Sequence, residues 1–396
     1  MTPKTSIRWA ALGASMLALC ACEMFQPAPP LPLQIEADAG DVVDDQQIVV
    51  LARTSAAAFS LTQKSAVRGY VVESQEELTG LDLVLLVMTI PANMPGDAAI
   101  RELESMEPGV TAGVNHAYRV SAKDGSGDGR REYAGRLLGW PDGGCRANAV
   151  IGLIDAAADA SDPGLTGVSL TFRDFTGTKS GPAADTDHGT VTAQILAGEG
   201  RLAGVRLQNA GVLSDHRMAK EAAGVDSLVR AIDWMQVSDV RLVNISLAGP
   251  YNKILDRSLQ QAIAKGMIIV AAAGNNGPES PPRYPAAFDG VIAVTAIDVE
   301  SKIYDNAVRG AHIDFAAPGV DVFVLVGGEG EYVTGTSVAA PYVTARIAAD
   351  PRALSAKTAG ETMKALVESS ADLGAPGRDV VYGYGLPILK DGCGTR

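Results

Sequence analysis

Four polar residues, each next to an apolar or helix-like run, have the types needed for acyl transfer. Asp155 ends AVIGLID, His188 lies in DTDHGT, Asn275 ends IIVAAAGN, and Ser337 lies in GTSVAAP. Serine becomes a nucleophile when a histidine takes its proton, and a carboxylate fixes the tautomer of that histidine. An asparagine amide can donate to the oxyanion of the tetrahedral intermediate. The set therefore suits hydrolysis of an acyl bond by a serine.

Small residues surround Ser337, and a helix is predicted to begin there. Its free backbone N–H groups and positive dipole end would then lie beside the hydroxyl. Taken alone, Ser337 could be an ordinary helix N-cap, Asn275 a turn residue, and Asp155 a strand-end aspartate. The order of all four residues on successive elements favours the chemical interpretation.

Apolar runs alternate with helical stretches from residue 149 onward. Such runs are typical of parallel strands buried on both faces, so we predict a doubly wound, mostly parallel α/β sheet. Ligands of such a sheet lie at the carboxyl ends of its strands. Strands are expected at 149–155, 240–249, 266–275 and 289–298, and helices at 190–198, 225–236 and 254–266.

An independent pattern precedes this sheet. Strands are predicted at 47–52, 69–74, 81–90 and 110–120, with helices at 55–66 and 95–107. The order β-α-β-β-α-β predicts a small α+β domain of the ferredoxin-like kind. His116, a lone histidine in the last strand, is expected to be structural or exposed.

The three motifs around Asp155, His188 and Ser337 resemble those of the subtilisin-like serine endopeptidases, in the same order. VIGLIDAAAD resembles the aspartate motif, DHGTVTAQILAG the histidine motif and GTSVAAP the serine motif. The resemblance covers roughly residues 148 to 390. It implies that Ser337 attacks a peptide carbonyl and that His188 carries the proton. It also implies that Asn275 and the Ser337 backbone N–H hold the oxyanion.

The resemblance also implies where a peptide substrate binds. VNISLAGP resembles the family's substrate strand, and AAAGN resembles the segment around its oxyanion asparagine. Small apolar walls with no charge predict a preference for apolar side chains. The implied substrate-binding residues are Ser246, Leu247, Ala248, Gly249, Ala273 and Gly274.

Two departures from the family pattern keep a second function open. Ala156 and Ala157 follow Asp155, where the family usually has Ser or Thr and then Gly, and Val191 replaces a second histidine. The alternative is a catalytically inactive subtilisin-like envelope protein that binds peptides. Asp159 and Asp162 are expected to be solvated loop residues, and His216 and His312 to lie in loops.

The chain divides into five predicted parts. Residues 1–22 form a lipoprotein-type signal peptide, 23–46 a Pro-rich then acidic tether, and 47–120 a domain that resembles the family's inhibitory propeptides. Residues 121–147, rich in Gly, Asp, Arg and Ser, are predicted to be a linker. Residues 148–396 are the predicted peptidase domain.

The N-terminus predicts an envelope location. Lys4 and Arg8 precede a short apolar stretch, and LCAC resembles a bacterial lipobox that ends at Cys22. We predict lipidation at Cys22 and an outer-membrane lipoprotein that faces the periplasm, with plain secretion as the alternative. The membrane, a peptide or protein substrate and the chain's own propeptide domain are thus the expected partners.

The two remaining cysteines and the charge complete the predictions. In an exported protein Cys145 and Cys393 are predicted to form a disulfide, and two free buried thiols are the alternative. The net charge of -13 argues against a nucleic-acid partner. No cofactor and no metal ligands are predicted, although structural calcium is common in the family.

Overall fold

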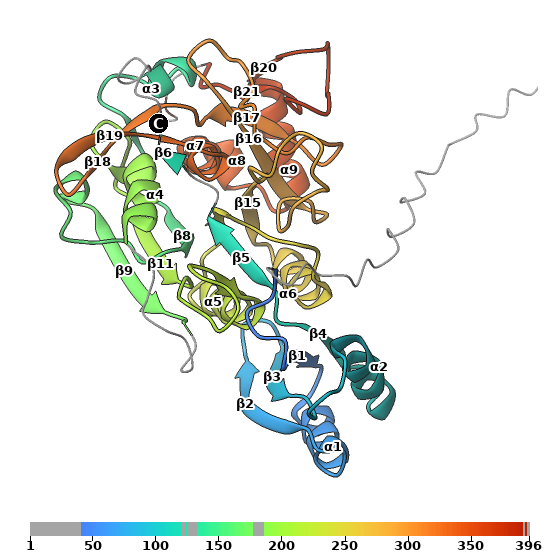
Figure 1. The fold of residues 1–396 in the computed structure, drawn as a ribbon. Helices are drawn as coiled ribbons and strands as arrows, with labels where there is room; N and C mark the ends of the chain where they lie inside the picture. The colour runs from blue at the N-terminus through green and yellow to red at the C-terminus, as the bar shows by residue number, and fades with distance from the viewer. Residues whose placement is uncertain (1–40, 121–122, 125–132, 177–185, 391–392, 394–396) are drawn as a thin grey trace, which may run out of the picture. The chain divides into compact units, whose positions relative to one another are not determined.

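The computed structural model describes residues 41–120, 123–124, 133–176, 186–390 and 393 (Figure 1). The predicted signal peptide, Cys22 and most of the tether lie outside the described residues, so the lipid anchor stays a prediction. No helix in the described part of the chain is long and apolar enough to cross a membrane.

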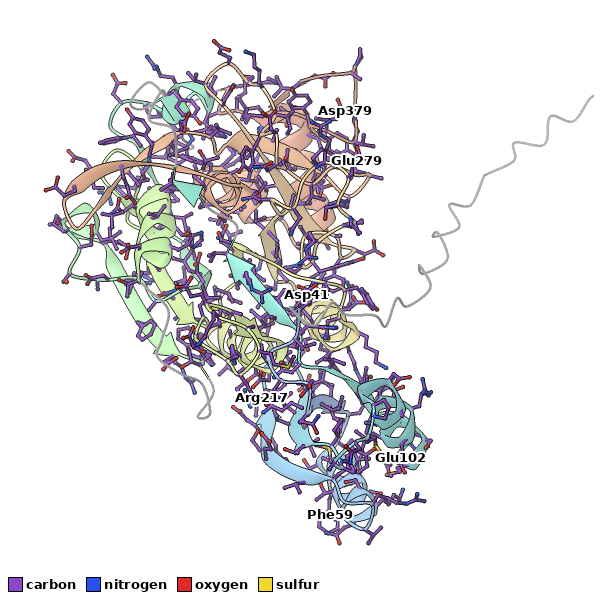
Figure 2. The ribbon with its side chains drawn as sticks, viewed as in Figure 1. Asp41, Phe59, Glu102, Arg217, Glu279 and Asp379 are labelled. Atoms are coloured by element: carbon purple, nitrogen blue, oxygen red, sulfur yellow. A yellow bond between two sulfur atoms is a disulfide. The ribbon has the colours of Figure 1, made fainter. Side chains whose placement is uncertain are left out.

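The small domain has the predicted order of elements. Its antiparallel sheet has the strand order β2-β3-β1-β4. The Thr54 side chain caps α1 by accepting from the backbone N–H of Ala57, and apolar residues of both helices and the sheet form a separate core. Phe59, labelled in Figure 2, is exposed on α1. The elements are β1 (Gln47–Ala52), α1 (Ser55–Ala66), β2 (Val71–Leu78), β3 (Leu83–Thr89), α2 (Gly96–Met106) and β4 (Thr111–Val114).

The last predicted strand, 110–120, is in fact two strands in two different sheets. β4 belongs to the small domain, whereas β5 (Ala117–Val120) pairs with strands of the large domain. Side-chain contacts to the large domain hold the chain at the break: Asn115 Nδ2 donates to Asp226 Oδ1 over 3.0 Å, and the His116 ring contacts Asn252 Nδ2 at 2.9 Å. His116 is therefore an interface residue.

The large domain is built on the predicted parallel sheet. Within the described residues seven strands lie in the order β17-β16-β15-β13-β8-β11-β9, and all their pairings are parallel. The strands are β8 (Val150–Asp155), β9 (Ser169–Asp174), β11 (Arg206–Gly211), β13 (Leu242–Ile245), β15 (Ile268–Ala272), β16 (Val291–Ile297) and β17 (Phe315–Pro318).

Helices and short strands surround this sheet. The longer helices are α4 (Asp187–Ala197), α5 (Val225–Val237), α6 (Lys253–Ala264), α7 (Thr336–Ala349) and α9 (Ala359–Ser369). Shorter elements are α3 (Tyr133–Leu137), α8 (Pro351–Leu354), the 3-10 turn Pro163–Leu165, β6 (Lys123–Asp124), β7 (Cys145–Arg146), β10 (Leu202–Ala203), β12 (Ala223–Gly224), β14 (Leu247–Ala248), β18 (Val322–Val326), β19 (Glu329–Thr334), β20 (Ser370–Ala371) and β21 (Leu386–Pro387).

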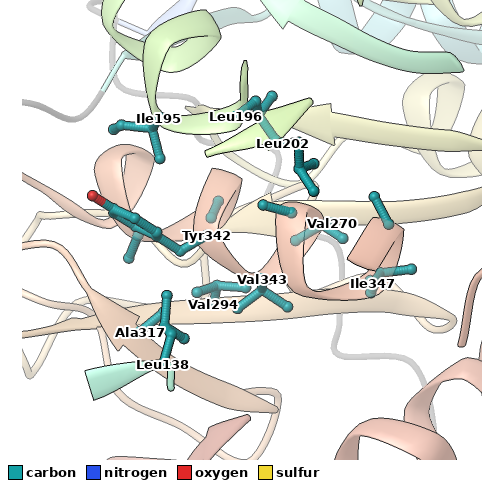
Figure 3. Close-up of a cluster of buried hydrophobic side chains, with 14 of the residues drawn as sticks. Leu138, Ile195, Leu196, Leu202, Val270, Val294, Ala317, Tyr342, Val343 and Ile347 are labelled. Carbon is teal, nitrogen blue, oxygen red and sulfur yellow. The ribbon is translucent and has the colours of Figure 1, made fainter. Parts of the chain in front are cut away.

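The helix that carries the serine motif, α7, runs through the core of the large domain. Every residue of α7 is buried, and its apolar side chains pack with α4 and the sheet (Figure 3). The buried guanidinium of Arg346 donates to Asp350, to Ser369 Oγ and to the carbonyl of Ile388. The position of α7 is thus set by packing on all sides.

The predicted linker 121–147 requires a correction. From Tyr133 onward the segment belongs to the core of the large domain: Tyr133 and Leu138 are buried there, and the Tyr133 hydroxyl donates to the carbonyl of Val320 over 2.5 Å. β7 pairs with β10. The Gly- and Asp-rich composition of this segment suggested a linker, although a few of its residues, such as Tyr133 and Leu138, pack into the core.

A disulfide joins Cys145 in β7 to Cys393. Its Cα atoms lie 5.4 Å apart, and 248 residues separate the two cysteines in sequence. It therefore connects the start of the large domain to the end of its described part.

We expect removal of this disulfide to lower stability. The bond limits the unfolded chain, and for so long a loop the entropy model sets an upper bound of about 5.5 kcal/mol. In a Ser337→Ala background, which prevents self-digestion, the Cys145→Ser/Cys393→Ser variant should unfold at lower guanidinium concentration. Equal thiol titres before and after reduction of the parent chain would exclude the bond.

Candidate active site

Three elements bring the predicted acid, base and nucleophile into one line. Asp155 ends β8, His188 lies in the first turn of α4, and Ser337 lies in the first turn of α7. His188 Nδ1 is 2.6 Å from Asp155 Oδ1, and His188 Nε2 is 3.1 Å from Ser337 Oγ. Both distances are hydrogen-bond distances. The geometry allows His188 to take the serine proton while Asp155 holds the other ring nitrogen.

The carboxylate of Asp155 is fully buried and has further donors. The backbone N–H of Ala156 donates to Oδ1 over 2.6 Å, and the Thr192 hydroxyl donates to Oδ2 over 3.0 Å. A buried charge requires such partners. Thr192 supplies a hydroxyl from α4, at a site where the sequence lacks the family's usual Ser or Thr after the aspartate. Its place one turn after His188 is the sequence signal that could have identified it.

The glycine of the His-Gly-Thr motif is required by a close approach of two backbones. A Cβ on Gly189 would lie only 2.4 Å from the carbonyl oxygen of Ala156 and 2.5 Å from that of Ala157. Thr190 then fixes the loop after β8, because its Oγ accepts from the N–H of Asp159 over 2.9 Å. These contacts hold α4 against the end of β8, so that His188 reaches Asp155.

Two sequence expectations about nearby residues need comment. Val191 replaces the family's second histidine and packs in the apolar core, away from any proton transfer. Asp162 was expected to be solvated, but it is buried: its carboxylate accepts from Gln194 Nε2 over 2.9 Å and from the Gly327 N–H over 2.8 Å. It joins α4 to the β18–β19 hairpin and supports the site from a distance.

Ser246 lies behind the nucleophile. Its hydroxyl donates to the backbone carbonyl of Ser337 over 3.0 Å and accepts from Asn244 Nδ2 over 2.8 Å. Asn244 Oδ1 in turn accepts from the Thr344 hydroxyl, two turns further along α7, over 3.0 Å. The buried side chain of Ser246, which lies between β13 and β14, thus holds α7 in place, and the substrate-binding role of this residue stays a prediction.

The Asn275 side chain is held at the start of α7. Its Oδ1 accepts from the Thr336 backbone N–H over 3.1 Å and from the Thr336 hydroxyl over 2.9 Å. Gly274, which has φ +101°, donates from its N–H to the same hydroxyl over 3.0 Å. These contacts fix the amide oxygen at the start of α7, so that the amide nitrogen is the atom of this side chain that could donate to a developing oxyanion.

The cleft beside this line contains a strand of the chain itself. β5 lies between β12 and β14 and pairs antiparallel with both. On one side Tyr118 is opposite Ala223, and on the other Arg119 and Val120 are opposite Ala248 and Leu247. The predicted substrate strand therefore already holds an extended segment. Beyond Val120, Lys123 pairs with Thr334, three residues before the nucleophile.

No group of three or more His, Cys, Asp or Glu side chains in the described ranges comes together as a metal site. Structural calcium therefore has no identified ligands in that part of the chain.

The fold and the site define a class, the serine hydrolases with a parallel α/β sheet and an Asp–His–Ser line. The model of the subtilase family (Peptidase_S8) matches residues 146–385, and the chain belongs to this family. Minor extracellular protease Epr of Bacillus subtilis (strain 168) is 30% identical over 63% of this chain and 39% of its own length. Subtilisin DY of Bacillus licheniformis is 30% identical over 61% of this chain and 89% of its own.

One solved structure supports the fold of both domains. Fervidolysin from Fervidobacterium pennivorans, described as a keratinolytic enzyme related to subtilisin, superimposes with a TM-score of 0.73 at 20% identity. The match covers 89% of this chain and 61% of fervidolysin. At this identity the likeness concerns the fold alone.

The Thr192 hydroxyl should matter for catalysis. Thr192→Val keeps the side-chain volume but leaves one oxygen of a buried carboxylate without its donor, a loss that corresponds to roughly 10- to 100-fold for a charged hydrogen bond. We expect kcat/KM for a peptide substrate to fall by that factor, while Thr192→Ser restores most of it. An unchanged rate in a correctly folded Thr192→Val variant would contradict the role.

Proposed function

We propose that the protein is a serine endopeptidase. The observation that carries this proposal is the line from Asp155 through His188 to Ser337, with hydrogen-bond distances of 2.6 and 3.1 Å. All the groups that acyl transfer requires are near one another at the carboxyl ends of the strands. Membership of the subtilase family supports the same conclusion.

The mechanism follows from the roles of these groups. Ser337 Oγ attacks the scissile carbonyl as His188 Nε2 takes its proton, and Asp155 stabilises the imidazolium. The oxyanion accepts from Asn275 Nδ2 and from the Ser337 backbone N–H at the positive end of α7. His188 then gives its proton to the leaving amine, and water releases the acyl group by the same steps in reverse.

We further propose that the domain at 47–120 is an inhibitory propeptide. β5 adds a strand to the edges of the cleft, the geometry in which an extended peptide binds by β-augmentation. Polar contacts support the docking of this domain: Asp233 Oδ1 accepts from the Leu81 N–H over 3.0 Å, and Lys253 pairs with Glu104 over 2.5 Å. The inhibitor thus occupies the place of the substrate.

The register brackets the bond at which the chain would cut itself. Val120 pairs on one side of the nucleophile and Lys123 on the other. Ser337 lies three residues after Thr334, which pairs with Lys123. The backbone carbonyl of Ser337 accepts from the hydroxyl of Ser246, the residue before Leu247. The cut is therefore expected at one of the three peptide bonds between Val120 and Lys123.

Active-site variants test the enzyme directly. Ser337→Ala should remove nearly all activity, prevent capture by a fluorophosphonate probe and leave the chain uncut between Val120 and Lys123. Asn275→Ala should lower kcat by roughly 10²–10³ and leave KM nearly unchanged, because its contact forms mainly in the transition state. Failure of the parent chain to react with the probe would favour the inactive peptide-binding alternative.

Acid should weaken the hold of the inhibitor through His116. Burial lowers the pKa of His116 to about 4, Asp41 opposes this shift and Arg283 adds to it. A free histidine has a pKa near 6.5. Protonation of His116 thus opposes docking of the domain at 47–120. The docking affinity has its full value above about pH 6.5, and it falls by up to tenfold per pH unit as the pH falls from there towards 4.

The measurement is the release of inhibitor from the cut complex. After incubation at pH 5 or pH 7, activity is assayed at one common pH, so that any pH dependence of the catalytic step does not intervene. Activity should appear faster after pH 5. A His116→Gln variant keeps an amide beside Asn252 and should lose this difference, whereas an equal difference in that variant would assign it to other groups.

A further inference from the structure

The described end of the predicted tether, residues 41–46, lies against the large domain. Val43 is at the centre of its contacts. The Val43 N–H donates to the carbonyl of Asn115 over 2.9 Å, and the Val43 carbonyl accepts from the N–H of Met218 over 3.1 Å. Asn115 lies in the segment that leads into β5, whereas Met218 lies in loop 214–222 of the large domain. Main-chain hydrogen bonds of Val43 therefore connect the inhibitory part of the chain to that loop.

The side chain of Val43 fills a small apolar pocket. It is 2% exposed and packs with three alanines, Ala117 of β5 and Ala219 and Ala222 of the loop. Val43 belongs to this cluster and not to the core of the small domain. Its burial therefore depends on the large domain and favours docking. For a valine side chain, full burial corresponds to roughly tenfold or more in an equilibrium constant.

An arginine of the loop contacts the acidic residues that follow Val43. Arg217 pairs with Asp44 over 2.8 Å and also pairs with Asp45. The side chain of Arg217 is 53% exposed, so these pairs contribute less than the buried valine, and salt screens them. They make the loop selective for an acidic segment.

The aspartate at the other end of the segment lies between two arginines. Asp41 Oδ1 is 3.6 Å from the guanidinium of Arg119 in β5 and 3.9 Å from that of Arg283 in the large domain. Asp41 and Arg217 are both labelled in Figure 2. The charge of Asp41 thus attracts the inhibitory strand and the large domain at the same time.

Both sides of this contact are held by hydrogen bonds of their own. In the loop, Ser214 and Ala222 exchange two backbone hydrogen bonds of 3.1 and 3.0 Å. Opposite it, Asp44 Oδ1 accepts from the N–H of Gln46 over 2.8 Å, which fixes the turn into β1. Because each side already has its shape, docking requires little further ordering of the chain.

We propose that residues 41–45 form a clasp, a second site through which the inhibitory part of the chain holds the enzyme after the cut. Loop 214–222 is the docking surface, and it fits an acidic segment with one buried valine. The cut inhibitor is then bound at two linked places, the cleft and the loop, and its release requires both to open. This inference rests on the proposed peptidase function, and it assigns regulation to residues that precede the inhibitory domain.

The test compares the full chain with its Val43→Asp variant, which places a charge in the apolar pocket. Both release the same enzyme, because Val43 stays in the removed part, so kcat/KM of the released enzyme is an internal control. Gel electrophoresis times the cut, and hydrolysis of a peptide substrate times the release. We expect the interval between the two events to shorten by roughly tenfold or more. An unchanged interval would overturn the role of the clasp.

Val67→Asp is the matched control. It makes the same change in the same domain, at a valine that follows α1 and is 84% exposed. The interval between cut and activity should keep its parent value in this variant. An interval as short as that of Val43→Asp would assign the effect to a weakened small domain and overturn the inference.

A charge exchange tests the ionic part of the clasp. Arg217→Asp should shorten the interval by roughly two- to fivefold, as expected for exposed pairs. Addition of Asp45→Arg should restore part of the interval, because the pair then forms with reversed charges. A double-mutant cycle isolates this pairwise contribution. Independent effects of the two changes would contradict the assigned pairing.

A measurement without catalysis separates the clasp from the proposed function. In uncut Ser337→Ala chains, Val43→Asp should speed hydrogen exchange at the Met218 amide by roughly tenfold or more, while the amide of Val270 in β15 keeps its protection. Unchanged protection of Met218 would overturn the clasp even in an active peptidase. Faster exchange in a chain that proves to have no peptidase activity would contradict the proposed function and leave the clasp as a contact between domains.

Discussion

The burial of α7 on every side is the constraint on which the site depends. A helix rich in alanine can lie deep in the core, close to the end of β8 that carries Asp155 and to the segment after β15 that carries Asn275, because its small side chains let backbones approach. Ser246, Asn244 and Thr344 then join the start of this helix to its middle and to β13. The nucleophile therefore lies on an element whose every residue is buried, where a fixed position limits reorganisation during the reaction.

The edges of β12 and β14 are covered by a strand of the chain itself. The edge of a strand carries backbone N–H and C=O groups that need hydrogen-bond partners. In this structure β5 supplies those partners to both β12 and β14. The folded domain that precedes β5 makes further polar contacts with the large domain, such as Lys253 with Glu104 and the Leu81 N–H with Asp233.

The parts of the fold that were predicted correctly have strong local signals. β8, β13, β15 and β16 are continuous apolar runs, and α5 and α6 have clear amphipathic patterns. β9 and β11 lacked a prediction because their sequences, SLTFRD and RLQNAG, are not apolar runs; β9 is largely exposed at the edge of the sheet. Likewise, nothing local marks the break between β4 and β5, since contacts with Asp226 and Asn252 of the other domain cause it.

The sequence by itself determined the chemistry: residue types, their order and the small residues around Ser337 already indicated a serine hydrolase of this fold. Tertiary structure decided how the groups are supported and what the cleft contains. Thr192 as a donor to Asp155, Ser246 as a support for α7 and the pairing of β5 with β12 and β14 all depend on residues far apart in the chain. The physical reason is that a motif records local backbone and reactive groups, whereas hydrogen-bond partners of buried atoms are chosen by packing between distant elements.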